Sequence, residues 1–586
     1  MSAPLAPLLS PPGWRDALAA RRAALRAGRA ARRRLPEPFP EGDADRGAAL
    51  LEGHFVLTPA APAPGRASLW EVAAPTAAFE AERQGFGWLD DLAAVGTGRA
   101  RALARRWTRA WQGAQGNGRG AGWTLPRAAQ RLPRLMAHAA WMADEEVGPT
   151  AAELDAAFAV HLRFLQARFA CLPGGAAGLS FAARMVAGAA GLDGGHILRE
   201  RAQGRIEALA AQVIDPAGGV ADRCPETLAT VFVDLAWAAR ALEEAGLDPL
   251  DGHRAALARA APTLRALRHG DGHVARFHGG GGGCPARLDA ASASARQARA
   301  AAPPPAIPMG FVALRRGRTC LVFDAATPPA DAAPGQAHAS TLAIEVTIGR
   351  QPLVVNCGPG AAFGPDWHRA ARQTPSHSTL IVDGASSAQF HEDRTAATTM
   401  QQAPQTIDTD LTAIAAPAPR VSASHDGYGG RFGLVHARQI AVALDGGGID
   451  GHDTLAAVNP AQRGRFAEAC AAAAAAASGG GAGLPFAIRF HLHPDVTAAH
   501  DPDRNRVTLA LSGGDRWVFA PGDGVTMRLD PGIFLENTRA DPVPCRQIVL
   551  HGRARHAVTG VRWRLFREDG QPPFRRTAPG AETADP

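Results

Sequence analysis

The sequence predicts an α+β protein with two large domains, an N-terminal helical domain followed by a C-terminal antiparallel β-sheet domain. Two observations predict this class. From about residue 78 to residue 278, apolar residues recur at three- and four-residue intervals, as on helices that bury one face. After a passage rich in Gly, Ala and Pro, the interval changes to two, as in strands that alternate between core and solvent. A chain of 586 residues is long enough for two or three domains with large cores.

The first half contains helical segments of similar length. Gly or Pro separates each segment from the next, and both residues end helices. Repeated helices joined by short breaks are typical of a bundle or an α/α toroid. The segments span 99–112, 151–170, 177–191, 197–214, 225–246 and 252–269.

The second half contains short runs rich in Val, Ile, Leu and Thr, separated by turn residues. Such runs predict a large antiparallel sheet domain of the sandwich type. The alanine-rich run 470–483 interrupts them and is interpreted as a loop or a short helix. The runs span 311–324, 341–356, 378–383, 434–444, 486–493, 506–511, 515–519, 546–551 and 560–566.

These patterns predict five regions along the chain. The toroid-like helical domain and the β domain are the two folded parts, and the segment between them is rich in Gly, Ala and Pro. A basic, partly disordered arm is expected before them and a disordered tail after them. The predicted limits are 1–40 for the arm, 41–280 for the helical domain, 281–306 for the linker, 307–570 for the β domain and 571–586 for the tail.

Composition excludes several classes of function. The chain has no lysine, which excludes Schiff-base catalysis and a phosphate-binding P-loop. Its arginines are scattered and form no basic stripe interleaved with aromatic residues, so no nucleic-acid partner is expected. The seven cysteines contain no Cys-x-x-Cys pair, which argues against a disulfide framework. Apolar runs end before about 18 residues, so no transmembrane span is expected, and no feature indicates an oligomeric state.

One polar cluster is predicted from the ends of three β-type runs. His338 precedes the first run, Asn356 ends the second and His377 precedes the third. Pairing of neighbouring strands would bring these three side chains together.

Several ordered segments resemble the heparinase II/III family. They are 53–55, 85–92, 335–338, 376–384, 425–429 and 489–494. The resemblance implies an α/α toroid followed by antiparallel β-sheets, and it implies β-elimination of a uronic-acid polysaccharide as the family function. It also implies an anionic polysaccharide bound in a cleft between the domains, and a place in the cell envelope or periplasm. Near the end of the predicted toroid, a basic rim that would suit such a ligand is offered by Arg268, His269, Asp271, His273, Arg276 and His278, and a solvated helix terminus is the alternative. Because no signal peptide is recognisable, a cytoplasmic location also stays open.

The resemblance also shows where this chain departs from its family. The amide or imidazole that neutralises the sugar carboxylate is replaced at Gly175 and Ala176, the catalytic tyrosine at Thr227, and the first histidine of a His-x-His pair at Gln336. The only tyrosine of the chain is Tyr428. Two hypotheses follow: a lyase with a rearranged site, or a catalytically silent descendant that binds a glycan or another envelope component.

The rearranged site would use Tyr428, His425 and His338 as its acid and base groups. The first two lie in a glycine-bounded segment for which a β-bulge with a capped Asp426 is the structural alternative. The resemblance also implies one zinc ion, held in the β domain by His338, Asn356 and His377, and no other cofactor. An amide oxygen is a weak ligand for zinc. The alternative is that both histidines hold strand ends together by hydrogen bonds.

Overall fold

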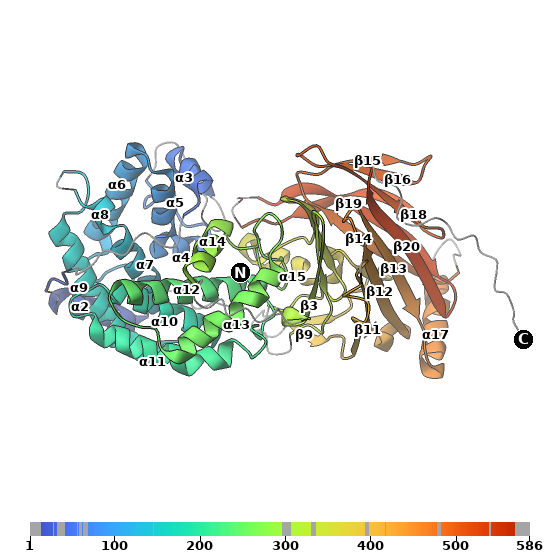
Figure 1. Ribbon diagram of the computed structural model, residues 1–586, viewed down its shortest axis with the longest axis horizontal. Helices are drawn as coiled ribbons and strands as arrows, with labels where there is room; N and C mark the ends of the chain where they lie inside the picture. Colours follow the sequence, from blue (N-terminus) through green and yellow to red (C-terminus); the bar gives the residue numbers. More distant parts are fainter. Residues whose placement is uncertain are drawn as a thin grey trace, which may run out of the picture.

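The computed structural model describes residues 13–26, 28–31, 42–55, 57, 61–62, 68–144, 146–295, 306–329, 336–392, 398–416, 418–476, 482–537, 539 and 541–568. Figure 1 shows a helical body coloured blue to green beside a β body coloured yellow to red. This order confirms the predicted fold class. The predicted tail 571–586 lies outside the described residues, as do most of the arm and residues 296–305 of the linker.

The helical body contains all six helical segments predicted from the periodicity. They correspond to α6, α9, α10, α11, α12 and α13, so these predictions are confirmed. No helix of the described residues is long and apolar enough to cross a membrane. The helices are α2 Trp14–Arg26, α3 Ala44–Leu51, α4 Ala77–Gly85, α5 Gly87–Val95, α6 Gly98–Gln115, α7 Leu125–Ala137, α8 Ala139–Met142, α9 Ala151–Arg168, α10 Gly175–Ala189, α11 His196–Val213, α12 Pro225–Glu244, α13 Asp251–Leu267 and α14 Pro285–Ser294.

Helix α10 packs against α7, α11 and α12. Small residues make this close packing possible. A Cβ atom added to Gly188 of α10 would lie 2.7 Å from Cγ of Leu132 in α7, which is closer than real Cβ contacts. The buried face of α10 also carries Leu179, Phe181 and Met185, which enter the main core. Helix packing here depends on tight fit of small and large side chains.

The β body consists of two antiparallel sheets with eight and seven strands in line. The first has the order β10 Ile407–Asp410, β11 Arg420–Tyr428, β12 Leu434–Val442, β13 Gly448–Ala456, β20 Val558–Arg567, β17 Arg516–Pro521, β16 Arg506–Ala510 and β15 Thr497–Asp501. The second has the order β18 Thr526–Phe534, β19 Val543–Ala554, β14 Leu484–Leu492, β6 Gln351–Val355, β5 Ile344–Ile348, β4 Thr319–Asp324 and β3 Phe311–Arg316, and β7 Leu380–Val382 pairs with β14. Two further pairs are β1 His54–Phe55 with β2 Ala61–Pro62, and β8 Gln389–Glu392 with β9 Thr398–Gln402.

Aromatic side chains from both sheets form the core between them. Phe490 of β14 lies 4.7 Å from Trp563 of β20 and 4.8 Å from Phe519 of β17, measured between ring centroids. Gly451 of β13 makes room for this cluster, because a Cβ atom there would lie 2.0 Å from the indole ring of Trp563. Gly451 therefore lets the Trp563 ring lie across its own sheet and reach Phe490 of the opposite sheet.

Two local predictions need correction, and a third has its helical alternative confirmed in part. The run 311–324 is a hairpin of β3 and β4, and the run 341–356 contains the hairpin of β5 and β6, because Gly317 and Gly349 adopt positive φ angles of 50° and 58° in the turns. Residues 285–294 of the expected linker form helix α14, which packs against α12. The alanine-rich run begins inside α17, Pro460–Ala476, so the helical alternative is confirmed for its first part.

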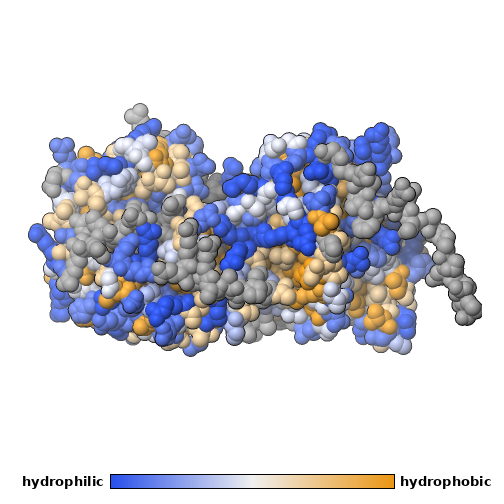
Figure 2. All heavy atoms as spheres, viewed as in Figure 1, coloured by the Kyte–Doolittle hydropathy of each residue, from blue (hydrophilic) through white to orange (hydrophobic). Residues whose placement is uncertain are grey.

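One arginine ties the two bodies together. Arg223, from the segment before α12, donates to the carbonyl oxygens of Met309 (2.8 Å) and Thr327 (2.6 Å) and pairs with Asp324 of β4 at 2.5 Å. Its guanidinium also lies 4.7 Å from the centroid of the Phe311 ring. Because Asp324 is fully buried, this contact fixes the orientation of the β domain against the helical domain. Hydrophilic side chains gather on the visible face near this junction (Figure 2).

Candidate functional site

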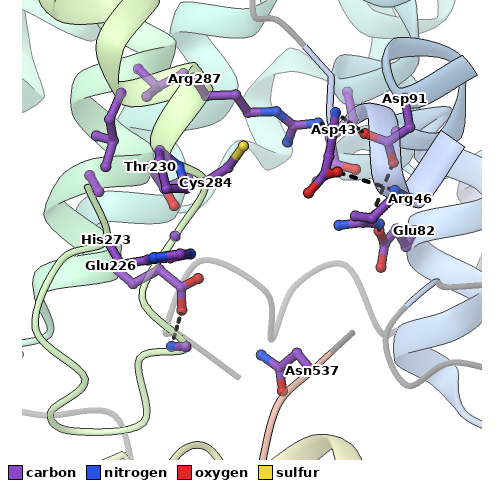
Figure 3. A pocket seen from close by; sticks show the side chains of 18 of the residues that line it. Asp43, Arg46, Glu82, Asp91, Glu226, Thr230, His273, Cys284, Arg287 and Asn537 are labelled. Atoms are coloured by element: carbon purple, nitrogen blue, oxygen red, sulfur yellow. Dashed lines mark hydrogen bonds and ion pairs between the residues drawn. The ribbon is translucent and has the colours of Figure 1, made fainter. Parts of the chain in front are cut away.

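A cavity of about 670 Å³ lies between the helical body and the loop that follows β18. Helices α3, α4 and α5 form one wall, and α12, α14 and the glycine-rich segment before α14 form the other (Figure 3). The cavity combines apolar and polar side chains. Its polar lining consists of Asp43, Asp45, Arg46, Glu82, Asp91, Gln130, Arg134, Arg184, Glu226, Thr230, Asp234, His273, Arg287, Glu536, Asn537 and Arg539.

The first wall is organised around the start of α3. Asp43 is the N-cap of α3 and accepts hydrogen bonds from the main-chain nitrogens of the first turn. Its own N–H donates to Asp91 Oδ1 at 2.9 Å. Arg46 NH2 pairs with Glu82 Oε1 at 2.6 Å, and its Nε lies 3.2 Å from Asp91 Oδ2. Burial raises the pKa of the Asp91 carboxyl, although the guanidinium groups of Arg46 and Arg287 oppose this effect.

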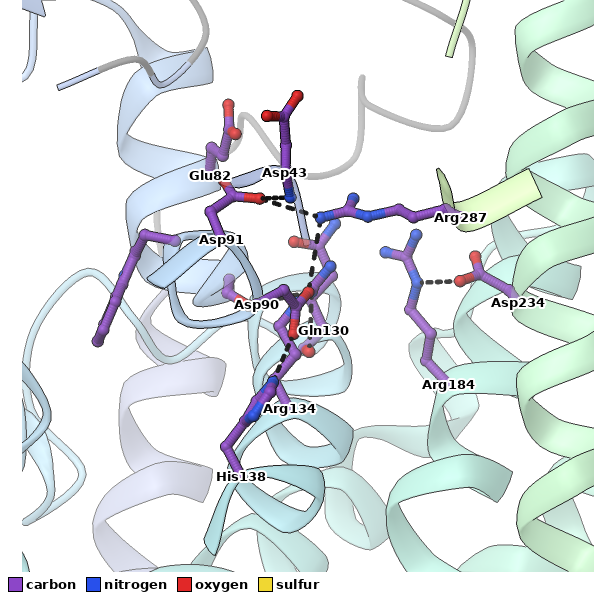
Figure 4. Close-up of polar contacts among 12 residues, drawn as sticks. Asp43, Glu82, Asp90, Asp91, Gln130, Arg134, His138, Arg184, Asp234 and Arg287 are labelled. Atoms are coloured by element: carbon purple, nitrogen blue, oxygen red, sulfur yellow. Dashed lines mark hydrogen bonds and ion pairs between the residues drawn. The ribbon is translucent and has the colours of Figure 1, made fainter. Parts of the chain in front are cut away.

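The base of this wall is a buried ion-pair network (Figure 4). Asp90 Oδ2 pairs with Arg134 Nε at 2.7 Å, and Asp90 Oδ1 lies 3.0 Å from His138 Nε2. Burial raises the pKa of Asp90, but Arg134 and the contact with His138 outweigh burial and lower it to about 2. Arg287 reaches across from α14, with NH2 3.6 Å from Asp90 and 3.8 Å from Asp91. The network thus connects α5, α7 and α14 around the cavity.

The opposite wall, formed by α12, α14 and the glycine-rich segment, also includes Arg184 of α10. Glu226, in the first turn of α12, accepts a hydrogen bond from the main-chain nitrogen of Gly281 at 2.7 Å. Two turns further along α12, Asp234 pairs with Arg184 Nε at 2.9 Å. Ser180 also donates to Asp234. Glu226 therefore lies at the start of helix α12, and Asp234 lies two turns further along the same helix.

Comparison with known proteins identifies the β domain. Residues 299–569 match the family model described as heparinase II/III-like, C-terminal. The β domain is therefore similar to this heparinase II/III-like C-terminal domain. The whole fold is similar to a crystal structure of heparinase III, with a TM-score of 0.58 and 11% identity over 87% of this chain and 79% of that chain. It is also similar to the heparan sulfate lyase HepC from Pedobacter heparinus, with a TM-score of 0.50 and 13% identity over 94% and 88%.

A relative in sequence covers most of both chains. FtsZ-localized protein C of Caulobacter vibrioides is 27% identical over 528 residues, which are 86% of this chain and 84% of that protein. The likeness therefore includes the helical domain as well as the heparinase II/III-like domain.

The predicted pair of Tyr428 and His425 lies inside the heparinase II/III-like domain, away from the cavity lining. The two rings are close, with centroids 5.6 Å apart, and both residues are 1% exposed. The Tyr428 hydroxyl donates to the carbonyl oxygen of Leu380 at 2.8 Å, and burial raises the pKa of the hydroxyl above its ordinary value. Burial lowers the pKa of His425, which contacts His436 at 3.3 Å.

The segment around this pair is a strand with a β-bulge. Strand β11 shifts register against β12 between His425 and Tyr428. Asp426 Oδ1 accepts hydrogen bonds from the main-chain nitrogens of Gln405 and Thr406. The structural alternative, a β-bulge with a capped Asp426, therefore describes the geometry of this segment. A catalytic role for Tyr428 or His425 stays a prediction, and neither side chain is exposed to solvent.

His338 and His377 do come together. His377 Nδ1 donates to the Gln373 carbonyl oxygen at 2.9 Å, so its Nε2 accepts from His338 Nδ1 at 3.2 Å. The main chain of the glycine-rich segment covers the remaining nitrogen, since a Cβ atom on Gly279 would lie 3.6 Å from His338 Nε2. Burial lowers the pKa of His338 well below its ordinary value and that of His377 to about 4. The imidazoles therefore act as neutral hydrogen-bonding groups at strand ends.

The predicted zinc set does not fit this geometry. Asn356 uses both of its polar atoms, because Oδ1 accepts from the Ser378 nitrogen at 3.0 Å and Nδ2 lies 3.2 Å from Glu345 Oε1. Three of the four ring nitrogens of His338 and His377 are engaged as described above. Within the part of the chain that the structure describes, no group of three or more His, Cys, Asp and Glu side chains is placed to hold a metal ion. Zinc needs several free donors around one point.

The four positions predicted to replace catalytic residues of the family also lie off the cavity lining. Thr227 is fully buried in α12, one residue after Glu226. Gly175 has a φ angle of 63°, and a Cβ atom there would meet no atom within 4 Å. Neither these two residues nor Ala176 and Gln336 belong to the lining.

The cavity residues come from several segments, and the sequence predicted a part in the site for only some of them. Of the expected rim residues, His273 lines the cavity, whereas the side chain of Arg276 lies over the Phe534 ring at 5.0 Å. The signature segment 85–92 contains the carboxylates of α5. The adjacent residues Asp90 and Asp91 stand within an apolar stretch, and this pattern could have indicated a buried polar site. Arg287 was missed because its segment was interpreted as a linker.

Proposed function

We propose that this protein binds a polysaccharide of the cell envelope in the cavity between its domains, without cleaving it by β-elimination. The observation that supports the proposal is the position of Tyr428. It is the only tyrosine of the chain, and its hydroxyl is bonded to Leu380 inside the β domain instead of facing the cavity.

The chemistry of β-elimination makes three demands at one sugar. One group must neutralise the uronic-acid carboxylate, a base must remove the C5 proton, and an acid must protonate the departing oxygen. Glu226 and His273 line the cavity and have the residue types for proton transfer. Neutralisation is the weaker part, because each arginine of the lining lies within 4 Å of a carboxylate of the chain, and the lining amides of Gln130 and Asn537 carry no positive charge. Proton transfer alone does not make the C5 proton acidic.

The relative in Caulobacter vibrioides favours a role in cell division. Its name places it with FtsZ, and the 27% identity extends over 86% of this chain. We therefore propose that the protein acts in the cell envelope at the division site. The second candidate is the family function itself, elimination of an acidic glycan by a rearranged site with Tyr428, His425 or His338.

Incubation with uronic-acid polysaccharides decides between the two candidates. Heparan sulfate, chondroitin sulfate and alginate are each mixed with the purified full chain, and the absorbance of unsaturated products is followed. We expect no product above the rate without protein. Steady product formation that Tyr428→Phe or His338→Ala abolishes would establish the lyase and refute the proposal.

A localisation experiment tests the second part of the proposal. A fluorescent fusion of the full chain is expressed in dividing cells together with labelled FtsZ. We expect the fusion to accumulate with FtsZ at the division site, and an even distribution over the envelope or cytoplasm would contradict the proposed place of action.

A further inference from the structure

The lining of the cavity carries more negative than positive charge. It includes seven carboxylates, from Asp43, Asp45, Glu82, Asp91, Asp234, Glu226 and Glu536. It includes five guanidinium groups, from Arg46, Arg134, Arg184, Arg287 and Arg539. A cavity with this balance has a negative potential, which disfavours an anionic ligand.

The five arginines attract an anionic ligand only weakly, because each already contacts a carboxylate of the chain. The pairs are Arg46 with Glu82 at 2.6 Å, Arg134 with Asp90 at 2.7 Å, Arg184 with Asp234 at 2.9 Å, Arg287 with Asp90 at 3.6 Å and Arg539 with Glu536 at 3.8 Å. A ligand carboxylate would have to compete with these existing partners for the same N–H groups.

Two carboxylates on opposite walls are held by main-chain nitrogens instead of arginine side chains. Asp43 accepts from the nitrogens of Asp45 and Arg46, and Glu226 accepts from Gly281. Main-chain N–H groups orient a carboxylate without cancelling its full charge. Figure 3 shows these two side chains on the two sides of the open space. They are therefore positioned to accept hydrogen bonds from a ligand between the walls.

An unsatisfied acceptor on the same wall points to a ligand that donates hydrogen bonds. Asp91 is 1% exposed and lines the cavity, yet its Oδ2 atom makes no hydrogen bond. It lies 3.2 Å from Arg46 Nε in a geometry that forms none, and Arg46 Nε is unsatisfied as well. Buried polar atoms normally have partners. A hydroxyl group both donates and accepts, so it complements these two atoms together.

We propose that the cavity binds a glycan whose sugars present hydroxyl, amide or ammonium groups and carry no carboxylate. This inference rests on the proposed function and assigns its ligand class. The carboxylates of the lining accept hydrogen bonds from the hydroxyl, amide or ammonium groups of such sugars. The ligand class differs from the uronic-acid polysaccharide that the family resemblance implies.

Binding of size-matched hexasaccharides tests the inference. The probes are the hexamer of N-acetylglucosamine, its deacetylated form with free ammonium groups, and a hexamer of uronic acid, each titrated calorimetrically into the full chain. We expect both amino-sugar hexamers to bind at least tenfold more tightly than the uronic-acid hexamer, which corresponds to about 1.4 kcal/mol. Only the affinity of the deacetylated hexamer should fall as salt is added, because salt screens charge pairs.

A double variant relates the effect to the cavity. Asp43→Asn with Glu226→Gln removes two charges and keeps an acceptor oxygen at each position, and asparagine also caps helices. We expect the affinity for the deacetylated hexamer to fall at least tenfold and that for the acetylated hexamer to fall less than threefold. Asp503→Asn with Asp523→Asn is the matched control, since both residues are exposed outside the cavity lining, and it should change neither affinity. Unchanged unfolding midpoints establish that both variants are folded.

The outcomes separate this inference from the proposed function. Tightest binding of the uronic-acid hexamer, or an equal effect of the control variant, would overturn the ligand class while glycan binding stands. Binding of no hexamer would overturn both.

Discussion

Replacement of Arg223 is expected to weaken the junction of the two domains more than any exposed substitution. The Arg223→Ala variant loses the charge partner of Asp324, whose carboxylate is fully buried. Removing one partner of a buried ion pair costs about 3–5 kcal/mol, because the other charge stays buried without compensation. The carbonyl oxygens of Met309 and Thr327 lose their donor as well. We therefore expect a loss of about 3–5 kcal/mol in the free energy of unfolding.

The structure also provides matched variants for this prediction. Alanine keeps the Cβ atom of residue 223, so the strain of its φ angle of 51° stays the same and the loss reports the side chain. The double variant Arg223→Ala with Asp324→Asn removes both charges. The double variant should lose less unfolding free energy than the sum of the losses in the two single variants, since no unpaired charge remains.

The assay is denaturation in urea, followed by tryptophan fluorescence and far-ultraviolet circular dichroism. A loss below about 1 kcal/mol for Arg223→Ala would show that the contact is no stronger than an exposed ion pair. Losses that simply add in the double variant would show that the two side chains are not coupled. Either result would refute the reasoning.

Three further predictions concern buried polar groups. Tyr428→Phe should lower the free energy of unfolding by about 1 kcal/mol, because the Leu380 carbonyl loses its donor; urea denaturation measures this, and no loss would contradict the contact. The free energy of unfolding should fall as pH drops from 6.5 towards 4, by up to ~3 kcal/mol for each buried histidine with a pKa of about 4, because these side chains bind protons less readily than in the unfolded chain. Unfolding midpoints that stay constant across this range would contradict it. These histidines are His253, His377 and His491. Stability should also fall as pH rises from 6.5 towards 10, because contacts with Cys320 and Glu345 outweigh burial and raise the pKa of His269 to about 10; Glu345→Gln should reduce this slope, and an unchanged slope would count against the pair.

Much of the fold could be predicted from local patterns. The change of apolar interval from three or four to two near residue 300 separates the helical domain from the β domain, because helix and strand geometry impose these intervals on any buried face. The same pattern was available for the site around Tyr428. Val421, Ala423 and His425 alternate along β11 and are all buried, which indicates an inward face instead of a catalytic loop.

Helix α14 shows where composition is a weaker guide. The segment 281–306 is rich in Gly, Ala and Pro, as linkers are, yet Leu288 and Ala291 are buried on one face of α14. Only the neighbouring α12 makes that burial favourable, since a helix of ten residues has little stability alone. The tertiary partner therefore decided its structure.

The sequence by itself determined the order of the two domains, most of their helices and strands, and the presence of a single tyrosine. These properties depend on residue type and on spacing over short stretches. Only the tertiary structure decided that Asp43, Asp91, Glu226 and Arg287 line one cavity and that His338 and Tyr428 do not. The cavity gathers side chains from segments that lie hundreds of residues apart, and their contacts and charges depend on packing that no local pattern records.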